Sequence, residues 1–201
     1  MKKKKKYNMR TTNTEVQKQP APIIRQREGL VRKIVPKAIC RVRKDMDSWR
    51  HALRQADCVD RPRRRLLMDL YADVMLDALL TSQIEQRIGR TMSAEFSLKD
   101  TTGKVDEEST RVLSEAVWFP LLLRYMLESV FYGHSLVEFS ASEVSGLEVT
   151  LIPRQNVVPE EGLFLFDSTA DDGVYYRDMR EYGTYVLEFG SPRHYGLLNK
   201  A

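Results

Sequence analysis

Apolar residues recur at helical spacing through the first two thirds of the chain. A short helix is predicted over residues 47–56, because its apolar side chains fall on one face and Asp47 or Ser48 can cap its start. A longer helix is predicted over residues 62–88, with Asp60 as its N-cap and Pro62 near its first position. These apolar stripes indicate helices that pack against a common core.

A third helical run covers residues 106–132. Pro120 predicts a break or a new helix start within it, since the proline ring disfavours an interior helical position. Residues 121–132 are apolar nearly all round, with Arg124 and Glu128 spaced to pair on adjacent turns. Such a composition predicts a buried helix.

Both long helical runs lead through a glycine into a similar short sequence. Gly89 is followed by Met-Ser-Ala-Glu-Phe-Ser-Leu at residues 92–98, and Gly133 by Ser-Leu-Val-Glu-Phe-Ser at residues 135–140. The repetition predicts two helix–strand units, each with its strand directly after the turn.

From Ser135 onward the period of the pattern changes to two. Apolar residues alternate along residues 137–141, 149–151 and 185–189, and Pro and Gly residues punctuate these runs. Helices first and strands afterwards predict an α+β fold with a mostly antiparallel sheet.

Charge divides the chain unevenly. Residues 1–65 hold 21 of the 32 Lys and Arg residues and only 6 of the 28 Asp and Glu residues, an excess of 15 positive charges. The remaining residues carry an excess of 11 negative charges. We therefore expect a basic, flexible N-terminal segment over residues 1–40, with few apolar residues to order it, and one folded domain over residues 41–201.

The basic residues form clusters that suit an anionic partner. They are Lys2, Lys3, Lys4, Lys5 and Lys6, then Arg41, Arg43 and Lys44, and finally Arg61, Arg63, Arg64 and Arg65. Two interpretations stay open: contact with the DNA backbone, which needs no base-reading module, or ion pairs within a subunit interface. The pair Leu30 and Val31, apolar within this basic region, could dock on a neighbouring subunit.

Acidic residues form a second candidate surface. Asp69, Asp73 and Asp77 lie four residues apart and would form one row on the predicted 62–88 helix. The row is either a solvated face or an interface that receives a basic segment. The pairs at residues 160–161 and 171–172 lie in turn-like contexts, which predicts that they face solvent.

The sequence contains no recognisable catalytic, nucleotide-binding or metal-binding motif. The chain has no phosphate-binding glycine loop, and its three histidines lack the spacing of metal ligands. The apolar stretch at residues 116–132 carries Arg124 and Glu128 and is too short to span a bilayer. We expect no enzymatic activity, no cofactor, no metal and no membrane partner.

Six segments together resemble the Mu-like bacteriophage portal protein family. They are Lys-Asp-Met-Asp-Ser-Trp-Arg-His-Ala-Leu (44–53), Arg-Leu-Leu-Met-Asp-Leu-Tyr (65–71) with Asp77, Ser-Gln-Ile-Glu-Gln-Arg (82–87), Tyr-Gly-His-Ser-Leu-Val-Glu (132–138), Leu-Ile-Pro-Arg (151–154) and Tyr-Gly-Leu-Leu-Asn-Lys (195–200). The resemblance covers residues 40–201 and rests on the order and spacing of these segments.

The resemblance implies a structural subunit of a ring, usually dodecameric, at one vertex of the capsid. DNA is packaged and ejected through such a ring, and the terminase motor and head proteins bind it, so the virion and the host cytoplasm during assembly are the implied locations. Portal chains are longer than this one, which implies an amino-terminal, wing-like part of a truncated chain or a prophage remnant. The alternative is a free-standing nucleic-acid-binding protein that works through its basic N-terminal segment.

Overall fold

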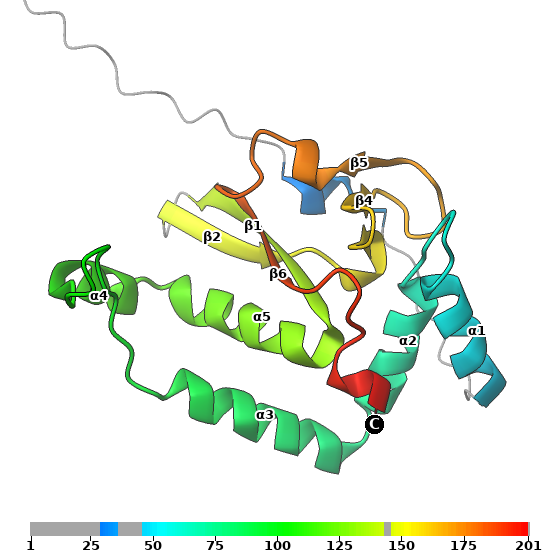
Figure 1. Cartoon of the computed structure of the whole chain (residues 1–201), viewed down its shortest axis with the longest axis horizontal. Coiled ribbons are helices and arrows are strands. Elements are labelled where there is room, and N and C mark those ends of the chain that lie inside the picture. Colours follow the sequence, from blue (N-terminus) through cyan, green and yellow to red (C-terminus); the bar gives the residue numbers. More distant parts are fainter. Residues whose placement is uncertain (1–28, 36–45, 143–145, 201) are drawn as a thin grey trace, which may run out of the picture.

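The structure, a computed structural model, describes residues 29–35, 46–142 and 146–200. In these residues five α-helices precede two small antiparallel sheets, which confirms the predicted α+β class (Figure 1). The helices are α1 (Met46–Ala56), α2 (Arg65–Val74), α3 (Ala78–Met92), α4 (Glu107–Glu115) and α5 (Phe119–Tyr132). α1 and α2 pack together at one end of the molecule, and α4 projects at the opposite end (Figure 1).

The run predicted as a single helix over residues 62–88 consists of α2 and α3, so that prediction was wrong. α2 begins at Arg65, three residues later than Pro62, and Asp60 does not cap it. The chain leaves the helical path after Val74, and Asp77 caps the new helix by accepting the N–H of Leu80 at 2.9 Å. An aspartate that satisfies a free N–H of the first turn favours a helix start at this position.

The break expected at Pro120 is confirmed. α4 ends at Glu115, and Pro120 lies in the first turn of α5, where its missing N–H is not needed. The expectation that α5 is buried holds for one face only. Leu122 and Phe131 are buried, but Leu121 and Val130 are 40% and 50% exposed, because the sheet covers a single side of the helix.

The larger sheet has the strand order β2-β1-β6, and β1 pairs antiparallel with both neighbours. Its strands are β1 (His134–Ser142), β2 (Gly146–Leu151) and β6 (Val186–Gly190). Val137 of β1 packs with Leu122 of α5, and Leu136, on the other face, packs with Phe164. The central strand is therefore covered on both sides, as its apolar sequence requires.

Only the second of the two predicted helix–strand units forms. Residues 135–140 lie in β1, but Met92 is the last residue of α3, and residues 93–98 form no strand. An isolated bridge between Lys99 and Val105 is the only strand pairing that residues 93–106 make. Residues 93–105 are exposed, so alternating side chains have no neighbouring sheet to cover.

The smaller sheet has the order β3-β4-β5, with β3 (Val157–Val158), β4 (Leu163–Leu165) and β5 (Gly173–Tyr175). A 3-10 turn, η1 (Leu30–Lys33), packs beside it on the larger sheet, where Leu30 is 4% exposed. The Leu30 N–H donates to the Glu138 carboxylate of β1 at 2.9 Å. Leu30 therefore docks on its own chain, where we expected it to contact a neighbour.

The C-terminal turn η4 (Leu197–Lys200) closes the helical core. Leu198 is 1% exposed and belongs to the buried helical core, where η4 contacts α5 and α2. The segment before η4 passes close to the end of α5, since a Cβ on Gly133 would lie 2.1 Å from the carbonyl oxygen of His194. Gly133 also has a φ of 85°, which a glycine adopts without strain.

Candidate interaction surfaces

Eight of the basic candidates lie outside the described residues, and their roles stay predictions. They are Lys2, Lys3, Lys4, Lys5, Lys6, Arg41, Arg43 and Lys44. The remaining cluster, Arg61 to Arg65, lies in the connection between α1 and α2 and ends at the first residue of α2. The structure places the side chains of this cluster in very different surroundings.

Arg61 and Arg63 bind one carboxylate on the loop between β4 and β5. Arg61 Nη1 lies 2.8 Å from Asp171 Oδ2, and Arg63 Nη2 lies 2.5 Å from Asp171 Oδ1. The side chains of Arg61 and Asp171 are 73% and 62% exposed, so water screens their attraction. Asp171 faces solvent as predicted, and it also holds two cations at the surface.

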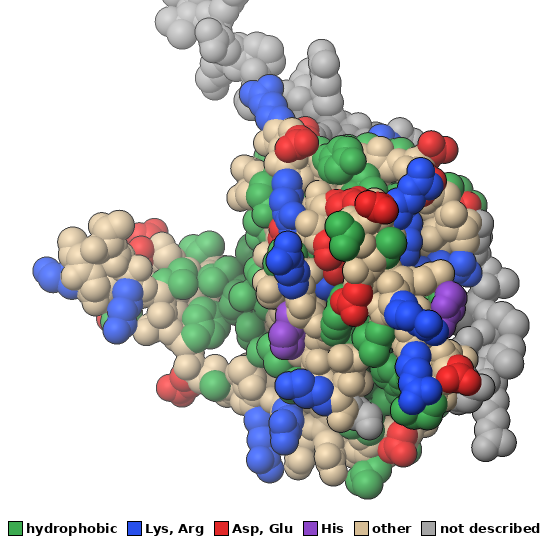
Figure 2. Space-filling view, turned by 45° about the vertical axis from the view of Figure 1, so that its right-hand side comes forward, with side chains coloured by type: hydrophobic (Ala, Val, Ile, Leu, Met, Phe, Trp, Pro, Cys, Tyr) green, Lys and Arg blue, Asp and Glu red, His purple; other side chains and the backbone are tan. Residues whose placement is uncertain are grey.

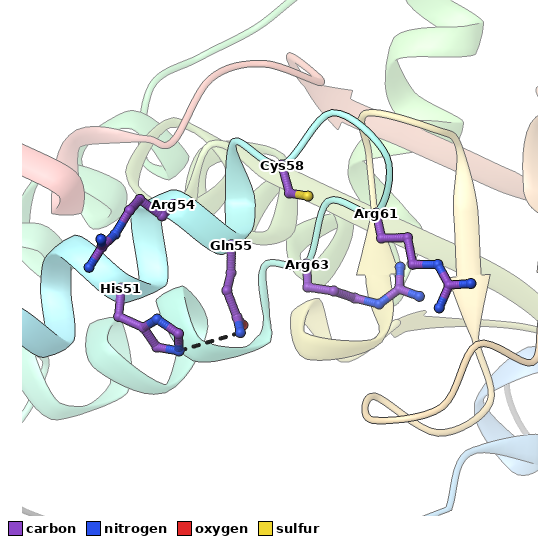
Figure 3. A pocket seen from close by; sticks show the side chains of 6 residues that line it. All are labelled: His51, Arg54, Gln55, Cys58, Arg61 and Arg63. Carbon is purple, nitrogen blue, oxygen red and sulfur yellow. Dashed lines mark hydrogen bonds between the residues drawn. The ribbon is translucent and has the colours of Figure 1, made fainter.

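These two arginines border a hollow on the surface of α1 (Figure 3). The α1 hollow has a volume of about 450 Å³ and is lined by His51, Arg54, Gln55, Cys58, Arg61 and Arg63. Arg54 lies at one end of it, and Arg61 and Arg63 lie at the other, with Gln55 and Cys58 between them (Figure 3). Three guanidinium groups against the single Asp171 carboxylate leave the hollow net positive.

Arg64 is a structural residue with its side chain only 1% exposed. Its Nη2 lies 2.7 Å from Glu160 Oε1, and its guanidinium donates to the carbonyl oxygens of Pro192 and His194. The same guanidinium lies 4.8 Å from the centre of the Tyr195 ring. Arg64 thus ties the start of α2 to the C-terminal segment, and it is not accessible to a phosphate.

The prediction that Glu160 faces solvent was wrong, because Glu160 is the ion-pair partner of the buried Arg64. Its side chain is 16% exposed and forms the ion pair with Arg64 across 96 residues of sequence. Sequence reasoning missed the partnership because a turn-like pair of acids normally indicates a solvated loop. The signal available was global: a basic first third and an acidic remainder favour pairing between them.

The predicted acidic row is divided between two elements. Asp69 and Asp73 lie on α2, and Asp77 is the N-cap of α3, so the three do not share one helix. Arg65, the first residue of α2, is partly buried and lies four residues before Asp69. The helix break at Met75 removes the continuous acidic face that the 62–88 helix would have presented.

A chain of alternating charges connects α3, α5 and the larger sheet. Arg124 of α5 binds Glu85 of α3 and pairs with Glu128 at 3.0 Å, as its spacing predicted. Glu128 in turn accepts from Arg154 at 2.9 Å, and Arg154 lies 4.1 Å from the centre of the Tyr132 ring. These contacts hold α5 at a fixed position between α3 and the sheet.

A second polar network surrounds Glu188 of β6, whose side chain is 11% exposed. Its oxygens accept from His134 at 3.0 Å, from Tyr176 at 2.9 Å, from Arg177 at 2.6 Å and from Tyr182 at 2.9 Å. Burial disfavours ionisation of Glu188, but these four donors outweigh it and hold the pKa of the carboxyl well below its usual range. Burial also lowers the pKa of His134, and because an ionised carboxylate can only accept, Nε2 of His134 is the donor in its 3.0 Å contact with Glu188.

The Glu188 network is structural in character. Its carboxylate is already saturated by donors, and a general base needs a free position for the proton that it accepts. In the described ranges no group of three or more His, Cys, Asp or Glu residues is placed to hold a metal ion. None of the helices found there is long and apolar enough to cross a membrane.

Exposed, paired basic side chains, a positive hollow and a projecting helix are features of a surface that meets other macromolecules. Comparison with known protein families shows what this chain is similar to. The family model described as the portal protein of Mu bacteriophage matches residues 68–201, which is more than half of the chain and extends from α2 to η4. No curated protein and no solved structure matches the chain. The chain belongs to the family of the portal protein of Mu bacteriophage.

Proposed function

We propose that this chain is a structural subunit, or part of one, of a phage or prophage portal ring through which DNA is packaged and ejected. The observation that carries the proposal is the family match, which spans three helices beyond α2 and both sheets. Portal proteins of this family are structural components of the phage. The buried networks around Arg64 and Glu188 suit this role, because they make a rigid body without a reactive group.

A ring requires two different surfaces on each subunit, one for each neighbour. Contacts of this head-to-tail kind close into a ring when the rotation between subunits divides a full turn. The α1–α2 end and the projecting α4 end of this chain are dissimilar and lie far apart (Figure 1). This geometry supports self-assembly, and a dodecamer is the stoichiometry that we propose.

We assign DNA contact to the basic N-terminal part of the chain, which includes the lysines at residues 2–6 and Arg41, Arg43 and Lys44. Contacts to the phosphate backbone carry no sequence preference, so a duplex can slide past them during transport. Terminase and head proteins are the further partners in this proposal. The assembly then belongs at a capsid vertex of the virion and forms in the host cytoplasm.

Electron microscopy of the purified chain tests the proposal. We expect ring-shaped particles in projection, with the density of one subunit repeated around the axis. Single particles of one subunit would contradict the assignment.

A free-standing nucleic-acid-binding protein is the second candidate, and the excess of 15 positive charges over residues 1–65 favours it. Deletion of residues 1–28, which leaves Leu30 in its core position, separates the two functions. If the chain acts only through its basic segment, the deletion abolishes DNA binding, and no rings form with or without that segment. A portal subunit loses DNA affinity and its steep salt dependence but still forms rings.

A further inference from the structure

The connection between α3 and α5 projects from the body of the molecule. We call residues 93–117 the α4 projection; it contains the bridge between Lys99 and Val105 and the helix α4. No residue of α4 is buried, and Figures 1 and 2 show the projection standing away from the sheets. A nine-residue helix without a buried side chain gains little from its own chain, since packing of one face supplies most helical stability.

The outer face of α4 combines Val112 with Glu108 and Glu115, and the exposed Arg111 lies beside the two carboxylates. The helix keeps an excess of negative charge through Glu107, Glu108 and Glu115. Val112 is 62% exposed, and the exposed Glu108 and Glu115 lie four residues before it and three residues after it. This spacing places all three side chains on the same side of the helix. The two carboxylates are separated by about 10 Å along the helix axis, with the valine between them.

The α1 hollow has the complementary arrangement at the opposite end of the molecule. Arg54 borders one end, Arg61 and Arg63 border the other, and Cys58 and Gln55 lie between the cations (Figure 3). Its volume of about 450 Å³ has room for an aliphatic side chain and its neighbours. Figure 2, in which this end comes forward, shows basic and acidic side chains together on this face and the projection at the left of the view.

We propose that the outer face of α4 in one subunit docks into the α1 hollow of the next subunit. Val112 enters the hollow beside Cys58, Glu108 and Glu115 approach its two basic ends, and the pairing repeats around the ring. The two surfaces of one subunit cannot meet each other, because they lie at opposite ends of its longest axis (Figure 1). The inference rests on the proposed ring and names the surfaces that would join its subunits.

Charge reversal tests the electrostatic part of the interface. Glu108→Arg with Glu115→Arg should weaken association at least about tenfold, as should Arg54→Glu with Arg61→Glu, because like charges then face each other. An equimolar mixture of the two double variants should assemble again, since every contact in an alternating ring is either native or exchanged. Circular dichroism confirms that each variant is folded before assembly is measured.

Disulfide formation tests the contact directly, with the native Cys58 as one partner. In a Cys40→Ser background, Val112→Cys should give a ladder of dimers, trimers and larger species on mild oxidation. Removing the native thiol by Cys58→Ser should leave dimers at most, because a bond between two identical positions cannot extend further. Ser114→Cys, on the other side of α4, is the matched control and should give no ladder.

The outcomes separate this inference from the proposed function. Rings that form normally in both charge-reversal variants, and no disulfide ladder with Val112→Cys, would overturn the interface and leave the portal assignment standing. A wild-type chain that never associates would overturn both. Association lost in each double variant and recovered in the mixture would support both.

Discussion

Arg64 and Glu160 form a nearly buried ion pair that joins the start of α2 to a loop 96 residues later in the chain. The two guanidinium nitrogens that face Glu160 Oε1 lie 2.7 and 2.8 Å from it. The remaining donors of Arg64 bind the backbone at Pro192 and His194. Through this one side chain the helical half of the fold, the smaller sheet and the C-terminal turn are linked.

Replacing Arg64 should therefore be strongly destabilising. Arg64→Met should lower the free energy of unfolding by about 3–5 kcal/mol, because it leaves the Glu160 carboxylate buried without its counter-charge. Arg61→Met, which removes an exposed pair from the same loop, should change it by less than about 1 kcal/mol. Urea denaturation followed by circular dichroism measures both values, and equal losses would contradict the structural role of Arg64.

The ionised state of Glu188 gives a pH-dependent prediction. Its folded pKa lies below the ordinary value of 4.5, so the carboxylate favours folding above that pH, and the contribution is lost as the pH falls through the folded pKa. The stability difference between wild type and Glu188→Gln should be large near neutral pH and shrink in increasingly acidic buffer. Glu148→Gln, an exposed change on β2, should show a small difference throughout. A constant gap for Glu188→Gln would argue against the network.

Two glycines should respond to the same substitution in opposite directions. Gly133→Ala combines a φ of 85° with a Cβ 2.1 Å from the His194 oxygen, and should lower the free energy of unfolding by about 2–5 kcal/mol. Gly89→Ala places its methyl group in open space on α3 and should raise it by about 0.5–1 kcal/mol. Thermal unfolding of the two variants gives the signs at once. Tolerance of alanine at Gly133 would mean that the C-terminal segment does not cross there.

Adjacent leucines in η4 provide a test of the docked C-terminal turn. Leu198 is 1% exposed in the helical core, so Leu198→Ala should lower the free energy of unfolding by about 2–5 kcal/mol. Leu197 is 40% exposed, and Leu197→Ala should change it by only about 0.5 kcal/mol. Chemical denaturation compares the pair under identical conditions. Equal effects would indicate that η4 does not contribute to the core.

The sequence predicted the parts of the fold that depend on local pattern. The helix around Trp49, the restart at Pro120, the pair of Arg124 with Glu128 and the alternating strand after Gly133 all follow from neighbouring residues. The failures depend on distant partners. Residues 92–98 alternate like a strand but have no sheet beside them, and a near-continuous leucine-rich pattern concealed the helix start at Asp77.

The candidate surfaces show the same division between local and distant information. The run from Arg61 to Arg65 is one basic cluster in the sequence. In the fold, however, the side chain of Arg64 is buried and links distant segments, whereas that of Arg61 lies at the surface. Nothing near Arg64 in the chain distinguishes it from its neighbours, since Glu160 and the carbonyl groups that bind it arrive from the far end. The α1 hollow likewise exists only after α1 and the following loop have folded together.

The central claim is that this chain is built to associate with copies of itself. Sedimentation velocity of the purified protein over a micromolar concentration series measures this association most directly. The account predicts species heavier than the 23.3 kDa chain that become dominant as the concentration rises, and their loss in the Glu108→Arg, Glu115→Arg variant. A single 23.3 kDa species at every concentration, identical in wild type and variant, would contradict it.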